Sequence, residues 1–402
     1  MPQNQRKAAY NANDNANDKA NDKANDNAND SVNATDAATT ARSGPGGVNL
    51  LDLTFEGLET FVVETLGEPK FRASQLWKWL WQHDARDFSG MTNLSKALRA
   101  RLPEAAHIRW PEAVDVQNSK DGTTKFLLRL KDGKLIETVL IPGAQGNHTQ
   151  CLSTQVGCAM GCTFCNTGLM GLERNLTHGE ILGQILVGRA HLAAHGLEPL
   201  RRLVFMGMGE PLMNLDTVLD ALRSMNSDIG LNFSWRRSTI STVGLPKMLK
   251  KLGESGLALP AISLHAPTQE LRRRIMPRAA EVPLDELMAA LDAFPMRPRE
   301  RITYEYLLLG GVNDSLEHAK QLADLLAQRR CKVNLIAYNA TENAPYASPD
   351  AGQVERFEKY LWDRGMTATI RRSMGADIKA ACGQLKAEHG AEHGSEHGSG
   401  KQ

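Results

Sequence analysis

From Gln150 onward, the chain alternates short apolar segments with amphipathic ones, and this alternation limits the fold more than any other feature. The apolar segments have the length and composition of strands, and they are Cys151–Val156, Leu203–Met206, Ser238–Ser241, Ala261–His265, Ile302–Leu308 and Lys332–Ala337. The intervening segments have helical periodicity, as in Glu180–Ala194, Leu215–Asn226, Leu284–Phe294 and Leu316–Arg329. The pattern predicts an α/β fold for residues 144–385, with a parallel sheet curled into a partial, TIM-like (β/α)6 barrel. The active site of such a fold lies at the carboxyl ends of the strands.

Two smaller regions precede this core. Residues 49–105 predict a small helical domain, because apolar residues recur with helical spacing in the segments 55–66, 74–81 and 94–102. The segment from Lys70 to Leu102 contains seven Lys or Arg and two Asp, which gives a local charge of +5. This excess favours an RNA-binding surface, although an ordinary solvated face has the same composition. Residues 106–143 predict a β-hairpin linker, with strands at 113–117, 125–130 and 135–141 joined by two Lys-Asp-Gly turns.

Both ends of the chain have the composition of disordered tails. Residues 1–48 include a tetrapeptide ending in Ala-Asn-Asp that occurs five times between Asn11 and Asp30. Residues 386–402 include three Glu-His-Gly repeats, which could bind a divalent metal but fit a solvated tail better.

Bulk properties indicate a cytoplasmic protein without a membrane span. The net charge of the 402-residue chain is only +1, so a polyanionic partner must be recognised by local patches. No apolar run approaches the ~20 residues of a membrane helix, and the first 45 residues lack the apolar region of a secretory signal. Six cysteines, three of them in one loop, favour a reducing compartment over a disulfide framework.

That loop follows the first predicted strand and contains Cys158, Cys162 and Cys165 in the spacing C-x3-C-x2-C. Three thiolates would leave one iron of a [4Fe–4S] cluster without a protein ligand. A zinc site would need a second cysteine pair or histidines at metal-binding spacing. A ferredoxin would need a fourth thiolate. The spacing therefore favours a cluster with one open iron over zinc, a plain electron carrier or unrelated thiols.

Residues after the later strands could hold an organic ligand beside this loop. Gly209 allows close approach of the main chain and Glu210 offers a carboxylate. Ser241, Ser263 and Asn339 lie at or just beyond strand ends, whereas His265 fits a ligand-binding or a structural role equally well.

The remaining cysteines have different contexts. Cys382 lies beside a glycine in a segment with little apolar content, which predicts an exposed loop thiol that could act as a nucleophile. Cys331 begins a predicted strand and is expected to be a small buried apolar residue. Cys151 lies seven residues before the first cysteine of the loop.

Several motifs, in order and at similar spacing, resemble those of the RlmN/Cfr family within the radical S-adenosylmethionine superfamily. The resemblance covers roughly residues 50–385, and the motifs are Gln155–Cys165, Phe205–Leu212, Ser241–Gly244, Ile262–Pro267, Lys332–Ile336 and Gly375–Gln384. One departure is Ala337, where relatives usually have Pro.

The resemblance implies roles for particular residues. Cys158, Cys162 and Cys165 would ligate a [4Fe–4S] cluster. S-adenosyl-L-methionine would be bound by a second set, namely Gly209, Glu210, Ser241, Ser263, Leu264, His265 and Asn339. Cys382 would carry a methyl group to C2 of an adenine, and Cys151 would release the product by a transient disulfide with Cys382. Glu137 matches a position assigned to proton transfer, although a partly exposed structural carboxylate is nearly as good an interpretation.

The resemblance also implies partners. The substrates would be an adenosine in the peptidyl-transferase centre of 23S rRNA and the adenosine 3′ to the anticodon of tRNA, with a flavodoxin or ferredoxin system as reductant. The enzyme would be a monomer. Arginine clusters would hold phosphates, at 201–202, 236–237, 272–274 with Arg278, and 371–372. Three alternatives remain: a C8-adenine methyltransferase, a non-enzymatic Fe–S protein that binds RNA or carries electrons, and a radical enzyme acting on a protein or small molecule.

Overall fold

The computed structural model describes residues 47–143, 146–340 and 344–386. The repeats predicted as tails lie outside these residues. Val48 was assigned to the leader, but it pairs with Ala106 in the short strands β1 (Val48–Asn49) and β2 (Ala106–His107). Within the described ranges, no helix is both long and apolar enough to cross a membrane.

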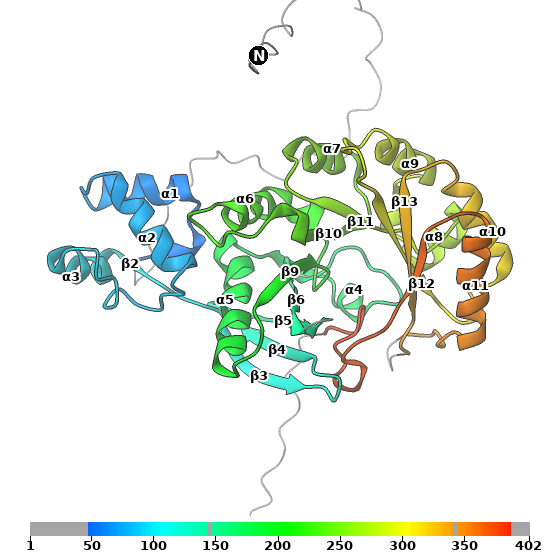
Figure 1. The fold of residues 1–402 in the computed structure, drawn as a ribbon, viewed down its shortest axis with the longest axis horizontal. Helices are drawn as coiled ribbons and strands as arrows, with labels where there is room; N and C mark the ends of the chain where they lie inside the picture. Colours follow the sequence, from blue (N-terminus) through cyan, green and yellow to red (C-terminus); the bar gives the residue numbers. More distant parts are fainter. Residues whose placement is uncertain (1–46, 144–145, 341–343, 387–402) are drawn as a thin grey trace, which may run out of the picture. The chain divides into compact units, whose positions relative to one another are not determined.

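One ten-stranded sheet carries both the predicted hairpins and the predicted barrel (Figure 1). Its order is β14-β13-β12-β11-β10-β9-β6-β5-β4-β3. Strands β6 and β9–β14 are parallel, whereas β3, β4 and β5 are antiparallel. The strands of this sheet are β3 (Glu112–Asn118), β4 (Thr124–Arg129), β5 (Leu135–Pro142), β6 (His148–Cys151), β9 (Leu200–Phe205), β10 (Ser238–Thr242), β11 (Leu259–Ser263), β12 (Ile302–Leu308), β13 (Cys331–Ala337) and β14 (Ala368–Arg371). The sheet is open, because β14 and β3 are its edges, and the prediction of an incomplete α/β barrel is confirmed.

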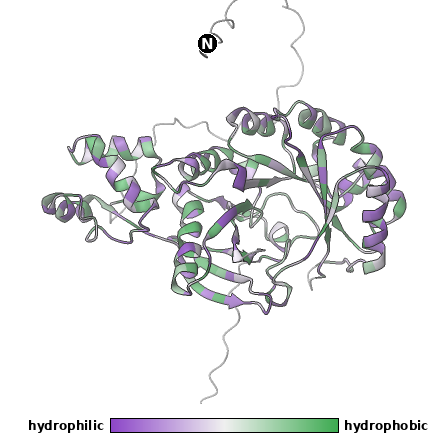
Figure 2. Ribbon diagram, in the orientation of Figure 1, coloured by the Kyte–Doolittle hydropathy of each residue, from purple (hydrophilic) through white to green (hydrophobic). Residues whose placement is uncertain are grey.

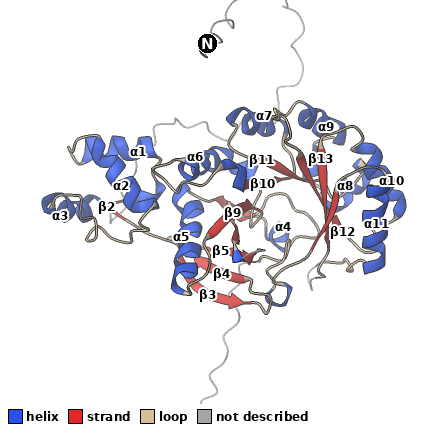
Figure 3. Ribbon diagram, in the orientation of Figure 1, coloured by secondary structure: helices blue, strands red, loops and turns tan. Residues whose placement is uncertain are grey.

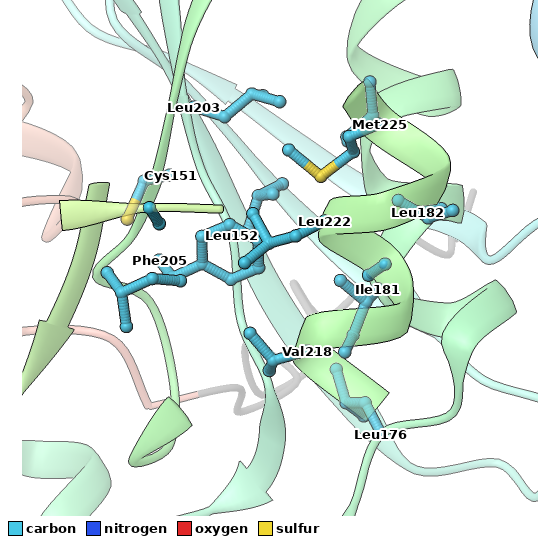
Figure 4. Close-up of a cluster of buried hydrophobic side chains, with 14 of the residues drawn as sticks. Cys151, Leu152, Leu176, Ile181, Leu182, Leu203, Phe205, Val218, Leu222 and Met225 are labelled. Atoms are coloured by element: carbon cyan, nitrogen blue, oxygen red, sulfur yellow. The ribbon is translucent and has the colours of Figure 1, made fainter. Parts of the chain in front are cut away.

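Helices between the parallel strands cover the outer side of the sheet (Figure 3). They are α5 (His178–Ala194), α6 (Leu215–Asn226), α7 (Pro246–Ser255), α8 (Gln269–Ile275), α9 (Leu284–Asp292), α10 (Leu316–Leu325) and α11 (Ala351–Asp363). In Figure 4, Leu222 and Met225 of α6 extend toward Leu152 and Leu203, and all four side chains are buried. Figure 2 shows hydrophobic and hydrophilic colours mixed along β9–β13, although β12 is buried along its whole length.

The amino-terminal helices form as expected. They are α1 (Phe55–Thr60), followed by a π-helical turn, α2 (Phe71–Trp81) and α3 (Lys96–Ala105). Trp77 and Trp81 are fully buried. The imidazole of His178 on α5 lies against this region, with its Nδ1 2.8 Å from the carbonyl oxygen of Leu51.

Several predicted boundaries were wrong. The expected first strand, Cys151–Val156, is divided between β6 and β7 (Gln155–Gly157), because the chain turns away to pair with β8 (Leu172–Asn175). Strand β11 ends at Ser263, and His265 has a left-handed φ of 55°. Cys331 begins β13 as expected but is only half-buried. Strand β14, which is short and half-exposed, was missed.

Candidate active site

A cavity of about 150 Å³ lies at the carboxyl ends of the parallel strands. Every parallel strand from β9 to β14 contributes to its lining. The remaining walls come from the cysteine loop and from the segment that carries Cys382. The position is the one that the rule for α/β barrels predicts.

The cysteine loop is shaped by close backbone contacts. Gly157 has a φ of 75°, and a Cβ there would overlap the carbonyl oxygen of Gly171. That oxygen accepts a hydrogen bond of 2.8 Å from the amide of Cys158. The short helix α4 (Asn166–Met170) follows the loop, and Thr163 N donates to the carbonyl of Ile275 on α8 at 3.0 Å. The loop is thus fixed from both sides before any ligand binds.

The three loop thiols fit a cationic metal core. All three line the cavity, and burial raises the pKa of Cys158 to about 12 and that of Cys162 well above its ordinary value. The negative charge of each neighbouring thiolate raises these pKa values further. Cys162 is buried and Cys158 and Cys165 are half-buried, so three adjacent thiolates here require positive charge between them, which an iron–sulfur cluster provides. In the described part of the chain, no three His, Cys, Asp or Glu side chains are grouped as a single-ion site.

The structure brings most of the predicted ligand-binding residues to this cavity. Five of them line it, namely Gly209, Glu210, Ser241, Ser263 and His265. Leu264 is fully buried and does not line it. Asn339 does not line it either, and its side-chain amide donates to Ser373 Oγ at 2.8 Å.

Glu210 is already engaged by the protein. Its Oε1 accepts from Thr242 Oγ1 at 2.6 Å and Leu212 N at 3.0 Å, and its Oε2 accepts from Val243 N at 2.9 Å. Burial raises the pKa of Glu210, and these hydrogen bonds oppose the shift. The carboxylate fixes the loop after β10. To bind an ammonium group as expected, its oxygens would have to accept from that group as well as from these protein donors.

His265 has a structural role. Its Nδ1 accepts a hydrogen bond of 3.0 Å from Leu307 N, so the single proton of the neutral ring lies on Nε2. Burial, with a smaller effect of the buried Arg272, lowers the pKa of His265 to about 3. The imidazole therefore stays neutral and can only donate into the cavity.

Cys382 faces the cavity on an exposed loop, as predicted. The protein that surrounds its thiol raises its pKa, whereas Arg371 lowers it. Cys151 is buried beside Leu152 and Phe205 (Figure 4), and burial, with a smaller effect of the charge of Cys382, raises the pKa of its thiol to about 12. All six cysteines are free in this structure, so the expected disulfide is not present.

Glu137 lies outside the cavity lining. The alternative of a partly exposed carboxylate was wrong, because the residue is buried on β5. Its Oε1 lies 2.9 Å from Lys125 Nζ, and its Oε2 accepts from the backbone amide of Lys386 at 2.8 Å. Both carboxylate oxygens therefore have partners.

Two charged residues that line the cavity were not predicted to do so from the sequence. Glu305 lies on β12 and is 3% exposed, and Arg371 ends β14. An acidic residue inside an otherwise apolar strand was the signal that could have identified Glu305. Arg371 was assigned to an RNA-binding cluster, but it lies inside the cavity instead.

Other basic residues also differ from expectation. Arg272 is fully buried and donates to the carbonyls of Ala279 and Val243, so it cannot hold a phosphate. In the helical domain, Glu59 and Glu68 lie outside the segment used for the charge count. They form ion pairs with Lys70, Arg72 and Arg101, so the local positive excess is smaller than predicted.

A three-cysteine loop at the mouth of an open α/β barrel defines the class of radical S-adenosylmethionine enzymes, and the family model of the Radical SAM superfamily matches residues 152–326. A model described as the ribosomal RNA large subunit methyltransferase N-terminal domain matches residues 48–108. The chain belongs to the RlmN family of radical SAM methyltransferases, as comparison with individual proteins shows.

The alignments with the relatives cover nearly the whole length of each relative. The dual-specificity RNA methyltransferase RlmN of Oleidesulfovibrio alaskensis is 62% identical over 344 residues, which are 85% of this chain and 96% of the relative. The protein of the same name from Lawsonia intracellularis is 51% identical over 85% of this chain and 97% of its own length. The crystal structure of a radical SAM methyltransferase from Sphaerobacter thermophilus superimposes with a TM-score of 0.80 at 41% identity, over 85% of this chain and all of that one.

Proposed function

We propose that this chain methylates C2 of an adenosine in 23S rRNA and in tRNA, through a methyl group carried on Cys382. The observation that carries the proposal is the placement of the Cys382 thiol in the same cavity as Cys158, Cys162 and Cys165. The names of the relatives, dual-specificity RNA methyltransferases, support an RNA substrate. The target base would have to leave its stack to reach this cavity.

The loop cysteines, Cys382 and Cys151 would each have a different role in this reaction. Cys158, Cys162 and Cys165 would hold a [4Fe–4S] cluster, which supplies the electron that cleaves S-adenosylmethionine to a carbon radical. Cys382 would accept a methyl group as a thiolate and present it to the base. Cys151, whose thiol lies close enough for the charge of Cys382 to raise its pKa, would form the transient disulfide that frees the product. Glu137 would take part in proton transfer after giving up one of its present partners.

Other parts of the protein would bind the RNA and accept electrons for the cluster. The helical domain, residues 49–105, would contact RNA through exposed cations such as Lys78 and Lys96. A flavodoxin or ferredoxin system would reduce the cluster of a monomeric, cytoplasmic enzyme. Methylation at C8 is the second candidate, because the same thiols could serve it. Membership of a methyltransferase family excludes the non-enzymatic alternatives.

The decisive experiment supplies anaerobically reconstituted protein with methyl-labelled S-adenosylmethionine and with 23S rRNA fragments and tRNA. Digestion and mass spectrometry should show 2-methyladenosine from the wild type and none from Cys382→Ala. Cys331→Ala is the matched control and should retain wild-type activity, because Cys331 does not line the cavity. Unlabelled RNA from the wild type would contradict the proposal, and 8-methyladenosine would favour the second candidate.

A further inference from the structure

Two charged residues of the sheet line the cavity with Cys382, and a polar residue on the strand between them contacts one of the two. Glu305 on β12 pairs in register with Asn334 on β13, which pairs with Thr369 on β14. Arg371 lies two residues beyond Thr369 and therefore on the same face of the sheet. Both Glu305 and Arg371 line the cavity that contains Cys382.

Glu305 has one carboxylate oxygen without a partner. Its Oε1 accepts a hydrogen bond of 2.9 Å from Asn334 Nδ2, whereas Oε2 is buried and has no hydrogen-bond partner among the described residues. A buried acceptor without a donor is costly, so a proton or a donor placed in the cavity would be favoured there.

The other candidate proton acceptors of the cavity are excluded by their contacts. Both oxygens of Glu210 accept hydrogen bonds from the protein. The Nδ1 of His265 accepts from Leu307 N, so its Nε2 carries the proton. Among the described residues that line the cavity, only Glu305 has a free carboxylate oxygen.

The electrostatics of this group act on Cys382 with opposite signs. Arg371 lowers the pKa of the Cys382 thiol, and Glu305 raises it. Burial raises the pKa of Glu305 itself, and Arg371, Asn334 and Lys332 oppose that shift. These groups, with Cys382, are the charged and titratable neighbours of Glu305 from β13, β14 and the carboxyl-terminal segment. A carboxylate with a raised pKa is better matched to a thiol than an ordinary one.

We propose that Glu305 accepts the proton of Cys382 and that Arg371 stabilises the resulting thiolate, which prepares Cys382 for its own methylation. The inference rests on the proposed function of Cys382 as methyl carrier. The Sγ–H proton moves to Glu305 Oε2, and a Cys382 Sγ lone pair forms the bond to the methyl carbon. The bond from that carbon to the sulfonium sulfur breaks, and its electron pair remains on S-adenosylhomocysteine. No oxidant or reductant is needed for this step.

The test compares the alkylation of Cys382 by iodoacetamide across pH in the reconstituted, full-length holoenzyme. Peptide mass spectrometry follows the unmethylated Cys382 peptide, with Cys331 as the internal reference thiol. Arg371→Met should raise the midpoint by about one pH unit, which is about a tenfold loss of thiolate at fixed pH, and Arg371→Lys should restore much of it. Arg372→Met is the matched control, since this neighbouring arginine is exposed and does not line the cavity.

The variant Glu305→Gln distinguishes the effect of the Glu305 charge on Cys382 from the role of Glu305 as proton acceptor. Removal of its negative charge should lower the alkylation midpoint of Cys382, yet methyl transfer from labelled S-adenosylmethionine to Cys382 should slow by about tenfold or more because the base is lost. A structural defect would not give these opposite effects. Unchanged midpoints in both variants, or methyl transfer at the wild-type rate in Glu305→Gln, would overturn the inference. If wild-type Cys382 gains no methyl group at all, the proposed function fails instead. If Arg371→Met does not fold, Arg371→Lys and Glu305→Gln still decide.

Discussion

Two glycines of the cysteine loop differ in why a side chain would be unfavourable there. Gly157 and Gly161 both have left-handed φ values, 75° and 60°. A Cβ at Gly161 would have nothing within 4 Å, whereas one at Gly157 would overlap the carbonyl oxygen of Gly171. Only Gly157 is therefore required by both conformation and space.

We expect Gly161→Ala to cost about 1–2 kcal/mol of stability from the left-handed backbone alone. Gly157→Ala should cost more, because Gly171 and the start of β8 must also move. The displaced loop should then bind less iron. Iron and sulfide content after reconstitution, together with urea unfolding, measure both effects, and equal losses in the two variants would contradict the argument.

At the scale of elements, the segment Ser373–Lys386 carries Cys382 and is held by three separate parts of the fold. The turn between β3 and β4 holds one end, where Gly375 N donates to Asp121 Oδ2 at 2.7 Å and Ser119 Oγ donates to Asp377 Oδ1 at 2.6 Å. Helix α4 holds the other, where Asn166 N donates to the carbonyl of Gly383 at 2.8 Å. Glu137 on β5 accepts from the amide of Lys386. The hairpins therefore help to place the thiol.

Asp121→Ala should loosen this segment and reduce the methyl label on Cys382. Burial opposes ionisation of Asp121, but hydrogen bonds from Gly375, Thr123 and Ser119 lower its pKa from 3.8 to about 2. Its contribution to stability is therefore complete above about pH 4 and is lost as the pH falls toward 2. The difference in Tm between wild type and variant should be constant from pH 7 to 4 and shrink below.

Asp132→Ala is the control for this prediction, since Asp132 occupies the equivalent position of the other Lys-Asp-Gly turn but bonds Arg174. It should leave the methyl label on Cys382 unchanged. Equal loss of label in both variants would show that the hairpins act on the whole sheet and not on this segment.

The same elements show what the sequence could predict. Strands and helices with strong periodicity were found, and β12 and α6 were predicted with their observed bounds. The cysteine loop was found because its ligands are adjacent in sequence. Glu305 and Arg371 were not, because they meet only through the register of β12, β13 and β14. The division of β6 from β7 depends on a non-local partner, β8, and local patterns carry no signal for it.

At the scale of the molecule, the amino-terminal helices and the barrel share a buried contact at His178. Its Nδ1 lies 2.8 Å from the carbonyl oxygen of Leu51 and its Nε2 lies 2.8 Å from Ser224 Oγ. The ring stacks on Trp77 with a centroid distance of 6.4 Å. One imidazole thus joins the first turn of the helical domain to α5 and α6, and the domain that we propose to bind RNA is tied to the barrel that we propose to modify it.

This contact should make stability depend on pH. Burial lowers the pKa of His178 below 6.5, despite its hydrogen bond to Leu51. Above pH 6.5 the residue is neutral in the folded and unfolded states, so its contribution is complete. As the pH falls from 6.5, the unfolded state binds a proton that the folded state excludes, and at pH 5 the loss reaches at most about 2 kcal/mol.

His178→Gln should therefore be less stable than wild type at pH 7, by about 1–3 kcal/mol, because one buried partner loses its hydrogen bond. The gap should narrow at pH 5, since glutamine does not titrate. The buried His265 titrates in both proteins and cancels in the difference. Urea unfolding at the two pH values measures the gap, with His195→Gln, at an exposed position at the opposite end of the same helix, as control. A gap that is independent of pH would mean that His178 has the same pKa in the folded and unfolded states, and burial of this contact would then not exclude the proton.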